Sequence, residues 1–438
     1  MNRPEIDARV PLIQEADLNH KIVLLRVDHN VVKKGGEIED PYRIDASIGT
    51  LFHIVERGGR PILMTHVGRT RDKKTGQIKT GPDTSVAPVI NYLERKLNTS
   101  FTIPELPVDP EWGIRGVGET LKPYIKELRD RRLGGLYLPN TRWFEGEEAK
   151  GDKRANLARD LAGLADVYVN DAFGSWQPHA STYDVTRNLP SYAGFLMQKE
   201  LINLKRVLEP ERPFVAVVAG SKYDTKIGPI KELYQKVDRL ILGGVIYNTW
   251  LCAKYGIKVA GVEDSDIELA KGLVQEDEKA GKVVELPIVV EADAATGRAP
   301  GRFRNLAVKE FKAGRGYGYF LDAAPESFTS PAVAEVLSSA RTFFVNAVMG
   351  FTPHYFEGSA AFYAAVTQNR RAQKLFGGGD TLQELRNLCP GLYLSALDDE
   401  TYYFFTGGGT VLKAIEEGSP LGLDIIKALM ENKAARPA

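Results

Sequence analysis

The chain has 438 residues, of which 43% are hydrophobic, so it is long enough for two compact domains with separate cores. Lysine plus arginine and aspartate plus glutamate both number 57, and this zero net charge gives no general attraction to nucleic acid or to an anionic membrane. The two cysteines, Cys252 and Cys389, form no metal-ligand or disulfide pattern. The sequence also shows no signal peptide and no apolar run of about 18 residues. We therefore expect a cytoplasmic protein, and a monomer.

In the first half, short apolar runs alternate with amphipathic segments. The runs at 21–28, 60–66, 134–140 and 166–171 are typical of buried strands. Residues 47–59 carry apolar side chains at helical spacing and end in glycine, which predicts a helix.

The second half repeats this alternation. Apolar runs at 214–220, 239–244, 341–350 and 374–380 precede helical stretches at 221–238, 245–256, 359–371 and 381–388. Strands that alternate with helices form parallel sheets covered on both faces. The sequence therefore predicts an α/β fold with two doubly wound parallel-sheet domains.

The predicted break between the domains lies in a helical stretch bounded by prolines, which would act as a helical hinge. We expect a first domain at 1–193, an interdomain helix at 194–213 and a second domain at 214–414. The last segment, 415–438, contains a helix that we expect to pack back on the first domain.

Polar and charged side chains stand at or just beyond the ends of the predicted strands in the first half. They are Arg26, Asp28, Asn30, Arg43, His66, Arg69 and Arg142. Because the strand ends of one parallel sheet meet in space, these side chains could line one basic pocket. Arginine suits such a pocket because its planar group binds carboxylate and phosphate oxygens through two hydrogen bonds. The alternatives are ordinary surface arginines, a structural His66, and a plain Asx turn at Asp28 and Asn30.

The second half combines glycine with charge. Lys222 and Lys226 are four residues apart at a predicted strand-to-helix junction, so we expect both amines on one face of the first helical turns. Glycine clusters follow predicted strands at 243–244, 377–379 and 407–409, where backbone N–H groups could approach phosphate oxygens. Asp380 offers an oxygen ligand for magnesium. A single cluster would indicate only a tight turn, but three clusters with a lysine pair favour nucleotide binding. There is no GxxxxGK[ST] or GxGxxG motif.

The ordered motifs of both halves resemble the phosphoglycerate kinase family. RVDHN, PYRID, THVGR, LPNTRWFEGEE and VNDAFG are similar to the motifs of its N-terminal domain, and AGSKYDTKIG, LILGG, FGGGDT and FTGGGT to those of its C-terminal domain. The matches run in the family's order over nearly the whole chain. The resemblance implies reversible phosphoryl transfer, in glycolysis, from 1,3-bisphosphoglycerate to ADP, giving 3-phosphoglycerate and ATP. It also implies magnesium as cofactor and lobes that close by a hinge.

The resemblance further implies a role for each matching residue. Arg43 and Lys222 would be the catalytic residues that stabilise the transferring group. The acid substrate would bind to Asp28, Asn30, Arg43, His66, Arg69 and Arg142. The nucleotide would bind to Lys222, Lys226, Gly243, Asn346, Gly378, Gly379, Asp380, Thr381, Gly407 and Gly408, with Asp380 as the metal ligand.

Several segments depart from the family's pattern, and two of the departures bear on how the substrates bind. Residues 175–179 read SWQPH, without the family's substrate-binding arginine, and the acidic residue expected at the nucleotide ribose is absent or has moved to Glu357. These departures leave two alternatives open, a kinase of the same fold acting on another carboxylic acid and a catalytically weak paralogue with a binding role. Retention of Arg43, Lys222 and Asp380 argues against the second alternative.

Overall fold

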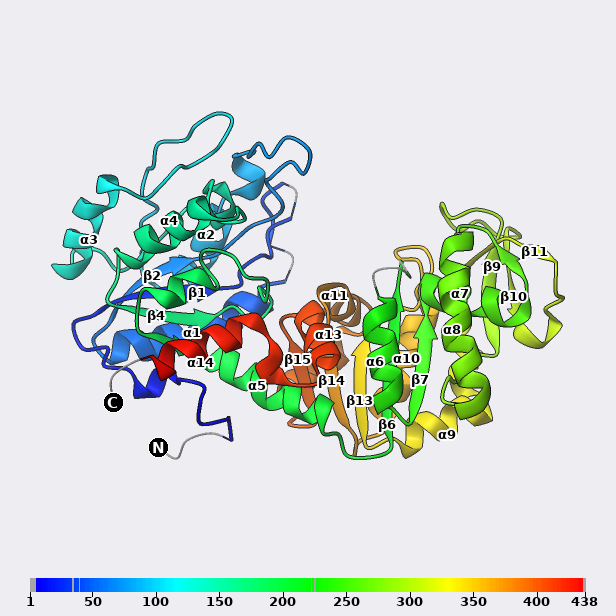
Figure 1. The fold of residues 1–438 in the computed structure, drawn as a ribbon. Helices are drawn as coiled ribbons and strands as arrows, with labels where there is room; N and C mark the ends of the chain where they lie inside the picture. Colours follow the sequence, from blue (N-terminus) through cyan, green and yellow to red (C-terminus); the bar gives the residue numbers. More distant parts are fainter. Residues whose placement is uncertain (1–4, 34, 39, 222, 224–225, 436–438) are drawn as a thin grey trace. The chain divides into compact units, whose positions relative to one another are not determined.

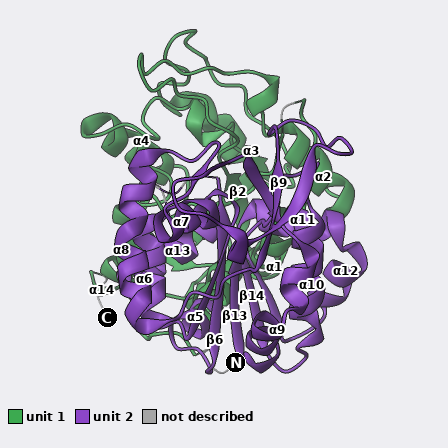
Figure 2. Cartoon of the chain, turned by 90° about the vertical axis from the view of Figure 1, so that its right-hand side faces the viewer, with its two compact units in different colours: residues 1–202, 420–438 green, residues 203–419 purple. Residues whose placement is uncertain are grey.

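The computed structural model describes residues 5–33, 35–38, 40–221, 223 and 226–435. Strands and helices alternate along the chain (Figure 1). The chain divides into two compact units, one of residues 1–202 with 420–438 and the other of residues 203–419 (Figure 2). Among the described residues, no helix combines the length and the apolar character needed to cross a membrane.

The first unit is built on a parallel sheet. Its strands are β1 (Ile22–Val27), β2 (Arg60–Met64), β3 (Leu136–Tyr137), β4 (Val167–Asp171) and β5 (Ser191–Ala193), in the spatial order β3-β2-β1-β4-β5. The helices are α1 (Tyr42–Glu56), α2 (Ala87–Leu97), α3 (Lys122–Arg129), α4 (Asp152–Ala162) and α14 (Asp424–Ala434), with α5 (Phe195–Leu208) leading into the second unit. The direction of strand succession reverses between β1 and β4, which is the point where ligands bind in sheets of this kind.

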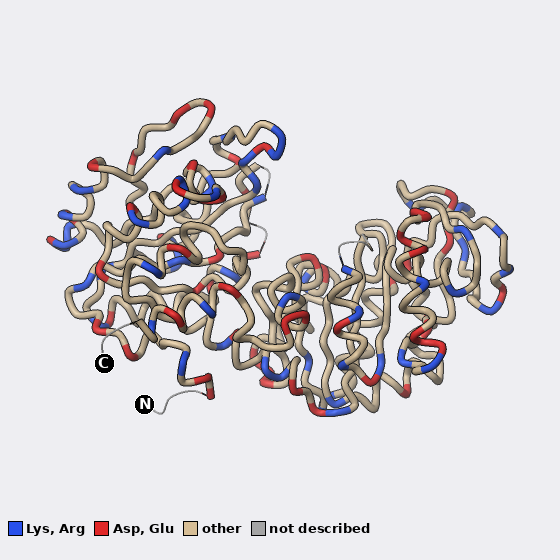
Figure 3. Tube along the Cα trace, viewed as in Figure 1, with Lys and Arg blue, Asp and Glu red and all other residues tan. Residues whose placement is uncertain are grey.

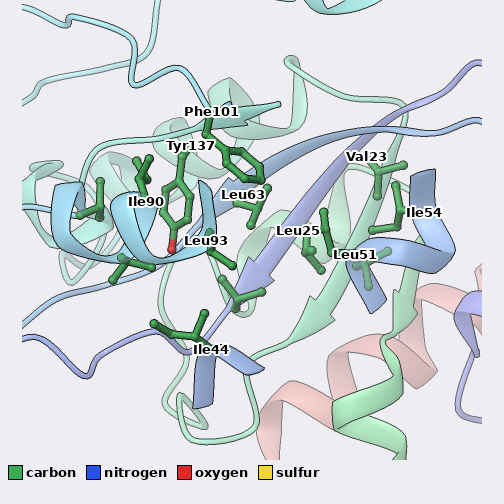
Figure 4. Close-up of a cluster of buried hydrophobic side chains, with 14 of the residues drawn as sticks. Val23, Leu25, Ile44, Leu51, Ile54, Leu63, Ile90, Leu93, Phe101 and Tyr137 are labelled. Atoms are coloured by element: carbon green, nitrogen blue, oxygen red, sulfur yellow. The ribbon is translucent and has the colours of Figure 1, made fainter. Parts of the chain in front are cut away.

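The alternation of side chains along β1 explains why helices cover both faces of this sheet. Val23 and Leu25 point to one face and pack with residues of α1 and α2 (Figure 4). Ile22 and Leu24 point to the other face and pack with residues of α3 and α4, such as Leu161. A strand that is buried at every position therefore lies between two apolar layers.

Helix α14 belongs to the first unit although it comes from the end of the chain (Figure 1). The Asn432 amide nitrogen donates hydrogen bonds to the backbone oxygens of Thr186, at 2.6 Å, and Leu189, at 2.9 Å. Its side-chain oxygen accepts a hydrogen bond of 2.9 Å from the backbone N–H of Ser191. One side chain thus satisfies three backbone groups beside β5.

The second unit contains a second parallel sheet. Its strands are β6 (Phe214–Gly220), β7 (Arg239–Gly243), β13 (Thr342–Asn346), β14 (Gln373–Gly377) and β15 (Tyr402–Phe405), in the order β15-β14-β13-β6-β7. Helices α6 (Ile227–Lys236), α7 (Gly244–Tyr255), α8 (Asp264–Ala280) and α13 (Gly408–Glu417) lie on one side of it, and α9 (Pro331–Ser339), α10 (Glu357–Gln368), α11 (Gly379–Leu388) and α12 (Pro390–Leu397) on the other (Figure 2). The strand order reverses between β6 and β13. The predicted fold class is confirmed.

The second unit also contains two small sheets that the sequence patterns did not indicate. Strands β9 (Ile288–Ala292), β10 (Phe303–Ala307) and β12 (Tyr319–Ala323) form an antiparallel sheet in the order β10-β9-β12. Strands β8 (Lys258–Val259) and β11 (Gly316–Tyr317) form a short parallel pair.

Candidate functional site

Asp28 and Arg43 form an ion pair at the carboxyl end of β1. Asp28 directly follows the strand and is buried, and Arg43 lies in the first turn of α1. The Arg43 Nη1 atom lies 3.5 Å from the Asp28 Oδ2 atom, and the Arg43 side chain keeps 24% of its surface exposed. The guanidinium group is therefore oriented by the protein but remains accessible to a ligand.

Asn30 connects the end of β1 to the loop after β2. Its side-chain oxygen accepts a hydrogen bond of 2.8 Å from the backbone N–H of Gly68. The alternative prediction for this segment was a plain Asx turn. The corresponding contact is present, because the Asn30 N–H lies 3.4 Å from Asp28 Oδ1. Asn30 thus positions the loop that carries His66 and Arg69.

His66 is held in its neutral form. Burial lowers its pKa well below the usual value, and the positive charges of Arg26, Arg142 and Arg43 lower it further. The Arg26 Nη2 atom lies 3.2 Å from His66 Nδ1. Because a guanidinium can only donate, Nδ1 is the acceptor and the ring proton resides on Nε2. His66 therefore offers a ligand a hydrogen-bond donor without a full positive charge.

Arg69 and Arg142 differ in how far the protein already uses their charge. Arg69 is exposed and makes no hydrogen bond or ion pair with the part of the chain that the structure describes. Arg142 Nε lies 2.8 Å from Glu148 Oε1, and its Nη1 donates to the backbone oxygen of Gly68. The expectation of ordinary salt-bridging thus holds for Arg142, while Arg69 is free to bind an anion.

The segment 175–179 adjoins this group of side chains through Ser175, whose Oγ atom lies 3.4 Å from His66 Nδ1. Gln177 is exposed, and its backbone oxygen accepts a hydrogen bond of 2.8 Å from Thr182. Arg71, which could replace a missing cation here, is already bound to the backbone oxygens of Glu145, at 2.6 Å, and Gly76, at 3.1 Å. The segment 175–179 thus contains no arginine, and the Arg71 guanidinium is already hydrogen-bonded within the protein. Neither replaces the substrate-binding arginine of the family pattern.

His29 is a functional candidate that sequence reasoning missed. It lies between Asp28 and Asn30, is fully buried, and contacts the hydroxyls of Tyr137, at 2.9 Å, and Ser47, at 2.8 Å. Burial lowers its pKa to about 3, so the ring is neutral. Its role is to fix the strand end that carries its two neighbours. The one sequence signal was a histidine two residues after the end of a mainly apolar strand.

In the second unit, Lys226 and Asn346 meet where the strand order reverses. The Lys226 amine donates hydrogen bonds to the Ala219 backbone oxygen, at 2.6 Å, and to Asn346 Oδ1, at 2.9 Å. Burial lowers the pKa of this amine to about 8, and the charge of Asp380 opposes that shift. The amine is thus a cation near neutral pH that titrates far more easily than an ordinary lysine.

The expectation that both lysines lie in the first turns of a helix is wrong for Lys226. Helix α6 begins at Ile227, and Lys226 is the residue before it. The physical reason is that the chain must turn after β6 so that the Lys226 amine can reach back to Ala219. Lys222 lies outside the described residues.

The glycines after β14 and β15 bring two helix N-termini together. Gly378 has a φ of +113°, which L-residues with a side chain rarely adopt. A Cβ atom at Gly408 would lie 2.5 Å from the backbone nitrogen of Gly378. The Asn346 amide nitrogen also donates a hydrogen bond of 2.6 Å to Gly377. The neighbouring Gly379 and Gly407 begin α11 and cap α13, so the two positive helix ends lie side by side.

Asp380 lies in the first turn of α11 and is exposed, while the next residue, Thr381, is buried. The Asp380 carboxylate has no hydrogen-bond partner among the described residues. Within the described ranges, no group of three or more His, Cys, Asp or Glu residues could hold a metal ion. A cation bound at Asp380 would therefore need oxygen ligands from a bound molecule. Magnesium bound to nucleotide phosphates has this property.

Gly243, at the end of β7, lines a small pocket of the second unit. The pocket is lined by Gly243, Gly244, Tyr247, Asn248, Leu286, Val289, Phe320, Asp322, Ala323 and Met349. Burial raises the pKa of Asp322 to about 7. The sequence patterns did not indicate the contributions of β9 and β12, because those strands were not predicted.

Glu357, the alternative ribose-binding acid, begins α10 and forms an ion pair with Arg298. The Arg298 guanidinium also lies over the ring of Phe303, 4.4 Å from its centroid. The carboxylate thus already has a strong partner within the protein. Along the Cα trace, acidic and basic residues are interspersed in both units (Figure 3).

One unit thus presents arginines and a neutral histidine at its strand ends, and the other presents paired helix N-termini, a lysine and an open carboxylate. These features define a two-domain α/β kinase.

Comparison with known proteins identifies the family. The chain belongs to the phosphoglycerate kinase family, whose model matches residues 13–418. It is 36% identical over 412 residues to the phosphoglycerate kinase of a Roseiflexus species, a match that covers 92% of this chain and 95% of that protein. It is 35% identical over 422 residues to the phosphoglycerate kinase of Thermus thermophilus, covering 94% and 98%.

Solved structures agree with this assignment. The structure of phosphoglycerate kinase from Coxiella burnetii matches with a TM-score of 0.72 and 29% identity, covering 97% of this chain and 99% of that one. The phosphoglycerate kinase of Pyrococcus horikoshii matches with a TM-score of 0.74 and the same coverage. At 21% identity, this second likeness supports the fold alone.

Proposed function

We propose that the chain catalyses reversible phosphoryl transfer between 1,3-bisphosphoglycerate and ADP, giving 3-phosphoglycerate and ATP in glycolysis. The observation that carries this proposal is the family match over residues 13–418, which spans both units. The first unit is the acid-binding domain and the second the nucleotide-binding domain. A cytoplasmic location and a monomeric state belong to the same proposal.

The acid substrate binds at the carboxyl end of β1. Arg43, oriented by Asp28, faces the transferring group, and its accessible guanidinium supports that role. Arg69 supplies a charge that the protein does not neutralise, and His66 donates through Nε2. Together with Asn30 and Arg142, these groups bind the carboxyl group and the phosphate that is not transferred.

The nucleotide phosphates bind at the N-termini of α11 and α13. The backbone N–H groups near Gly378, Gly379, Gly407 and Gly408 can approach them because no side chain intervenes. Lys226 adds a positive charge from the opposite side of Asn346. Gly243, which follows from the family pattern, contacts the remainder of the nucleotide, and Thr381 completes the first turn of α11. Lys222 keeps its proposed role at the transferring group on the sequence resemblance alone.

Magnesium fits this site, because Asp380 offers an open carboxylate beside the groups that bind phosphate. When bound, the ion neutralises charge on the phosphates. The protein's own contribution is positional and electrostatic, since a loose transition state needs fixed cations and donors more than a general base. Hinge bending is part of the proposal, because a phosphoryl group can pass only between substrates in contact.

A coupled assay with 3-phosphoglycerate and magnesium-ATP tests the function directly. We expect saturable turnover that depends on both substrates and stops when magnesium is removed. Absence of turnover with 3-phosphoglycerate, combined with turnover of another carboxylic acid, would replace the proposal by the same-fold alternative.

The alternative is favoured by one observation, the exposed and uncharged Gln177 in the segment that adjoins His66. A charge-assisted hydrogen bond contributes about 1.5–3 kcal/mol, so its loss weakens binding roughly ten- to a hundredfold. We expect Gln177→Arg to lower the KM for 3-phosphoglycerate and to leave the KM for ATP unchanged. An unchanged KM for 3-phosphoglycerate would show that this segment is not part of the substrate site.

A further inference from the structure

Behind the glycine-rich strand ends of the second unit lies a buried polar network centred on Glu384 of α11. The Glu384 side chain is buried, as is Tyr363 of α10. The Tyr363 hydroxyl lies 3.1 Å from Glu384 Oε2, 3.3 Å from the Ala347 backbone oxygen and 3.4 Å from the Thr381 backbone oxygen. The phenol has a single hydrogen, and the carboxylate is the closest and strongest of these acceptors.

Ser359 joins the same network from the first turn of α10. Its Oγ atom accepts hydrogen bonds from the backbone N–H groups of Met349, at 3.0 Å, and Gly350, at 3.4 Å. These bonds occupy the lone pairs of the hydroxyl, so its hydrogen is left to donate. The Ser359 hydroxyl lowers the pKa of Glu384 and so favours its charged form. The Glu384 Oε1 atom is buried and has no hydrogen-bond partner in the described part of the chain.

The network ties together two segments of the proposed nucleotide site. One is the first turn of α11, which contains Asp380 and Thr381. The other is the turn 347–350, which follows Asn346 and contains Met349. Met349 packs so closely on Gly243 that a Cβ atom there would lie 2.5 Å from its sulfur. We propose that Glu384 is a positioning residue, which acts through Ser359 and Tyr363 to hold the turn 347–350 against α11 for binding of the magnesium-nucleotide. This inference rests on the proposed function.

The charge of Glu384 is sensitive to pH. Burial is the main cause that raises its pKa to about 7; the carboxylates of Asp322 and Asp380 act in the same direction, and the hydroxyls of Ser359 and Tyr363 act against it. The Cys389 thiol at the end of α11 also faces this group, and burial and Glu384 raise the pKa of that thiol. Below about pH 7 the carboxyl carries a proton and accepts less strongly from the two hydroxyls. Nucleotide affinity should therefore weaken as the pH falls from 8 to 6.

The test compares the full-length protein with Glu384→Gln, Tyr363→Phe and a matched control, Glu335→Gln, at an exposed position of α9. Isothermal titration with magnesium-ADP from pH 6 to pH 8 measures binding without the acid substrate. At pH 8 we expect the Kd to rise about three- to tenfold in Glu384→Gln and less in Tyr363→Phe. The pH dependence of the Kd should be smaller in Glu384→Gln than in the unmodified protein. The control should match the unmodified protein.

Steady-state kinetics separate positioning from general stability. The KM for ADP should rise in Glu384→Gln while the KM for the acid substrate stays unchanged. A Kd and a pH profile equal to those of the unmodified protein would overturn the proposal, as would equal losses for both substrates. If Glu384→Gln does not fold, Tyr363→Phe decides, because an unchanged magnesium-ADP affinity in that variant also overturns it. Magnesium-ADP binding without any turnover of 3-phosphoglycerate would contradict the proposed function and leave the positioning role measurable.

Discussion

Lys226 gives the sharpest prediction about the nucleotide site, because its pKa is displaced toward the physiological range. The amine is partly buried against Ala219 and Asn346, and burial lowers its pKa to about 8 from an ordinary value of 10.5. With that pKa, about 90% of the amines are charged at pH 7 and about 10% at pH 9. If the charged amine binds nucleotide phosphate, affinity should fall about tenfold between these pH values. A lysine with the ordinary pKa would give almost no change in this range.

The substitution Lys226→Met keeps an apolar stem of similar length and removes the charge. Loss of a charge-assisted hydrogen bond contributing about 1.5–3 kcal/mol should weaken magnesium-ADP binding roughly ten- to a hundredfold at pH 7. The remaining affinity should vary little between pH 7 and pH 9. The matched control is Lys231→Met, at an exposed position of α6. Titration calorimetry measures each affinity. Tight binding by Lys226→Met, or a flat pH profile in the unmodified protein, would refute the assignment.

Further substitutions test the other parts of the site and the core. Arg43→Ala should lower kcat by about 10²-fold or more with little change in ADP affinity, and Arg95→Ala on α2 should have no effect; turnover equal to that of the unmodified protein would exclude Arg43 from the transferring group. Asp380→Asn should raise the magnesium concentration needed for half-maximal turnover without changing the melting temperature, and an unchanged magnesium titration would make Asp380 a structural residue. Asp171 at the end of β4 is buried, and burial raises its pKa to about 7, so it binds a proton more tightly in the folded state. The stability that this bound proton contributes is lost as the pH rises through about 7. Urea denaturation measures the free energy of unfolding. Between pH 5 and pH 8, this free energy should rise by about 2–3 kcal/mol in Asp171→Asn relative to the unmodified protein. A difference between the two proteins that does not change with pH would contradict the buried charge.

The strands of both parallel sheets could be predicted because runs such as Ile22–Val27, which is apolar except at Arg26, bury both of their faces. The antiparallel strands β9 and β12 could not. They are short, and each includes an acidic residue, Glu291 or Asp322, which hides the apolar pattern. Their pairing depends on contacts between segments distant in sequence, which local periodicity does not encode.

The grouping of side chains at the strand ends of the first unit followed from topology, but their charge states did not. The neutral form of His66 depends first on its burial and then on three arginines, and both arise only in the folded protein. In the second unit, Lys226 was predicted to lie within the first helical turn, but it precedes α6. The turn before α6 is set by the contact of the Lys226 amine with Ala219, which the sequence pattern does not show. Glu384 did leave a signal, since it occupies the helix face that also carries the buried Thr381 and Leu385.

The role of Asn432 in the first unit has a consequence for synthesis of the chain. The hydrogen bonds between Asn432 and the backbone groups of Thr186, Leu189 and Ser191 can form only after α14 has been made. A ribosome makes all of residues 203–419 before it reaches that helix, so the second unit can complete its fold first. Until α14 emerges, the first unit lacks its last helix and exposes the apolar side chains that α14 later covers. The unit that the ribosome begins first is therefore the unit that can be completed last.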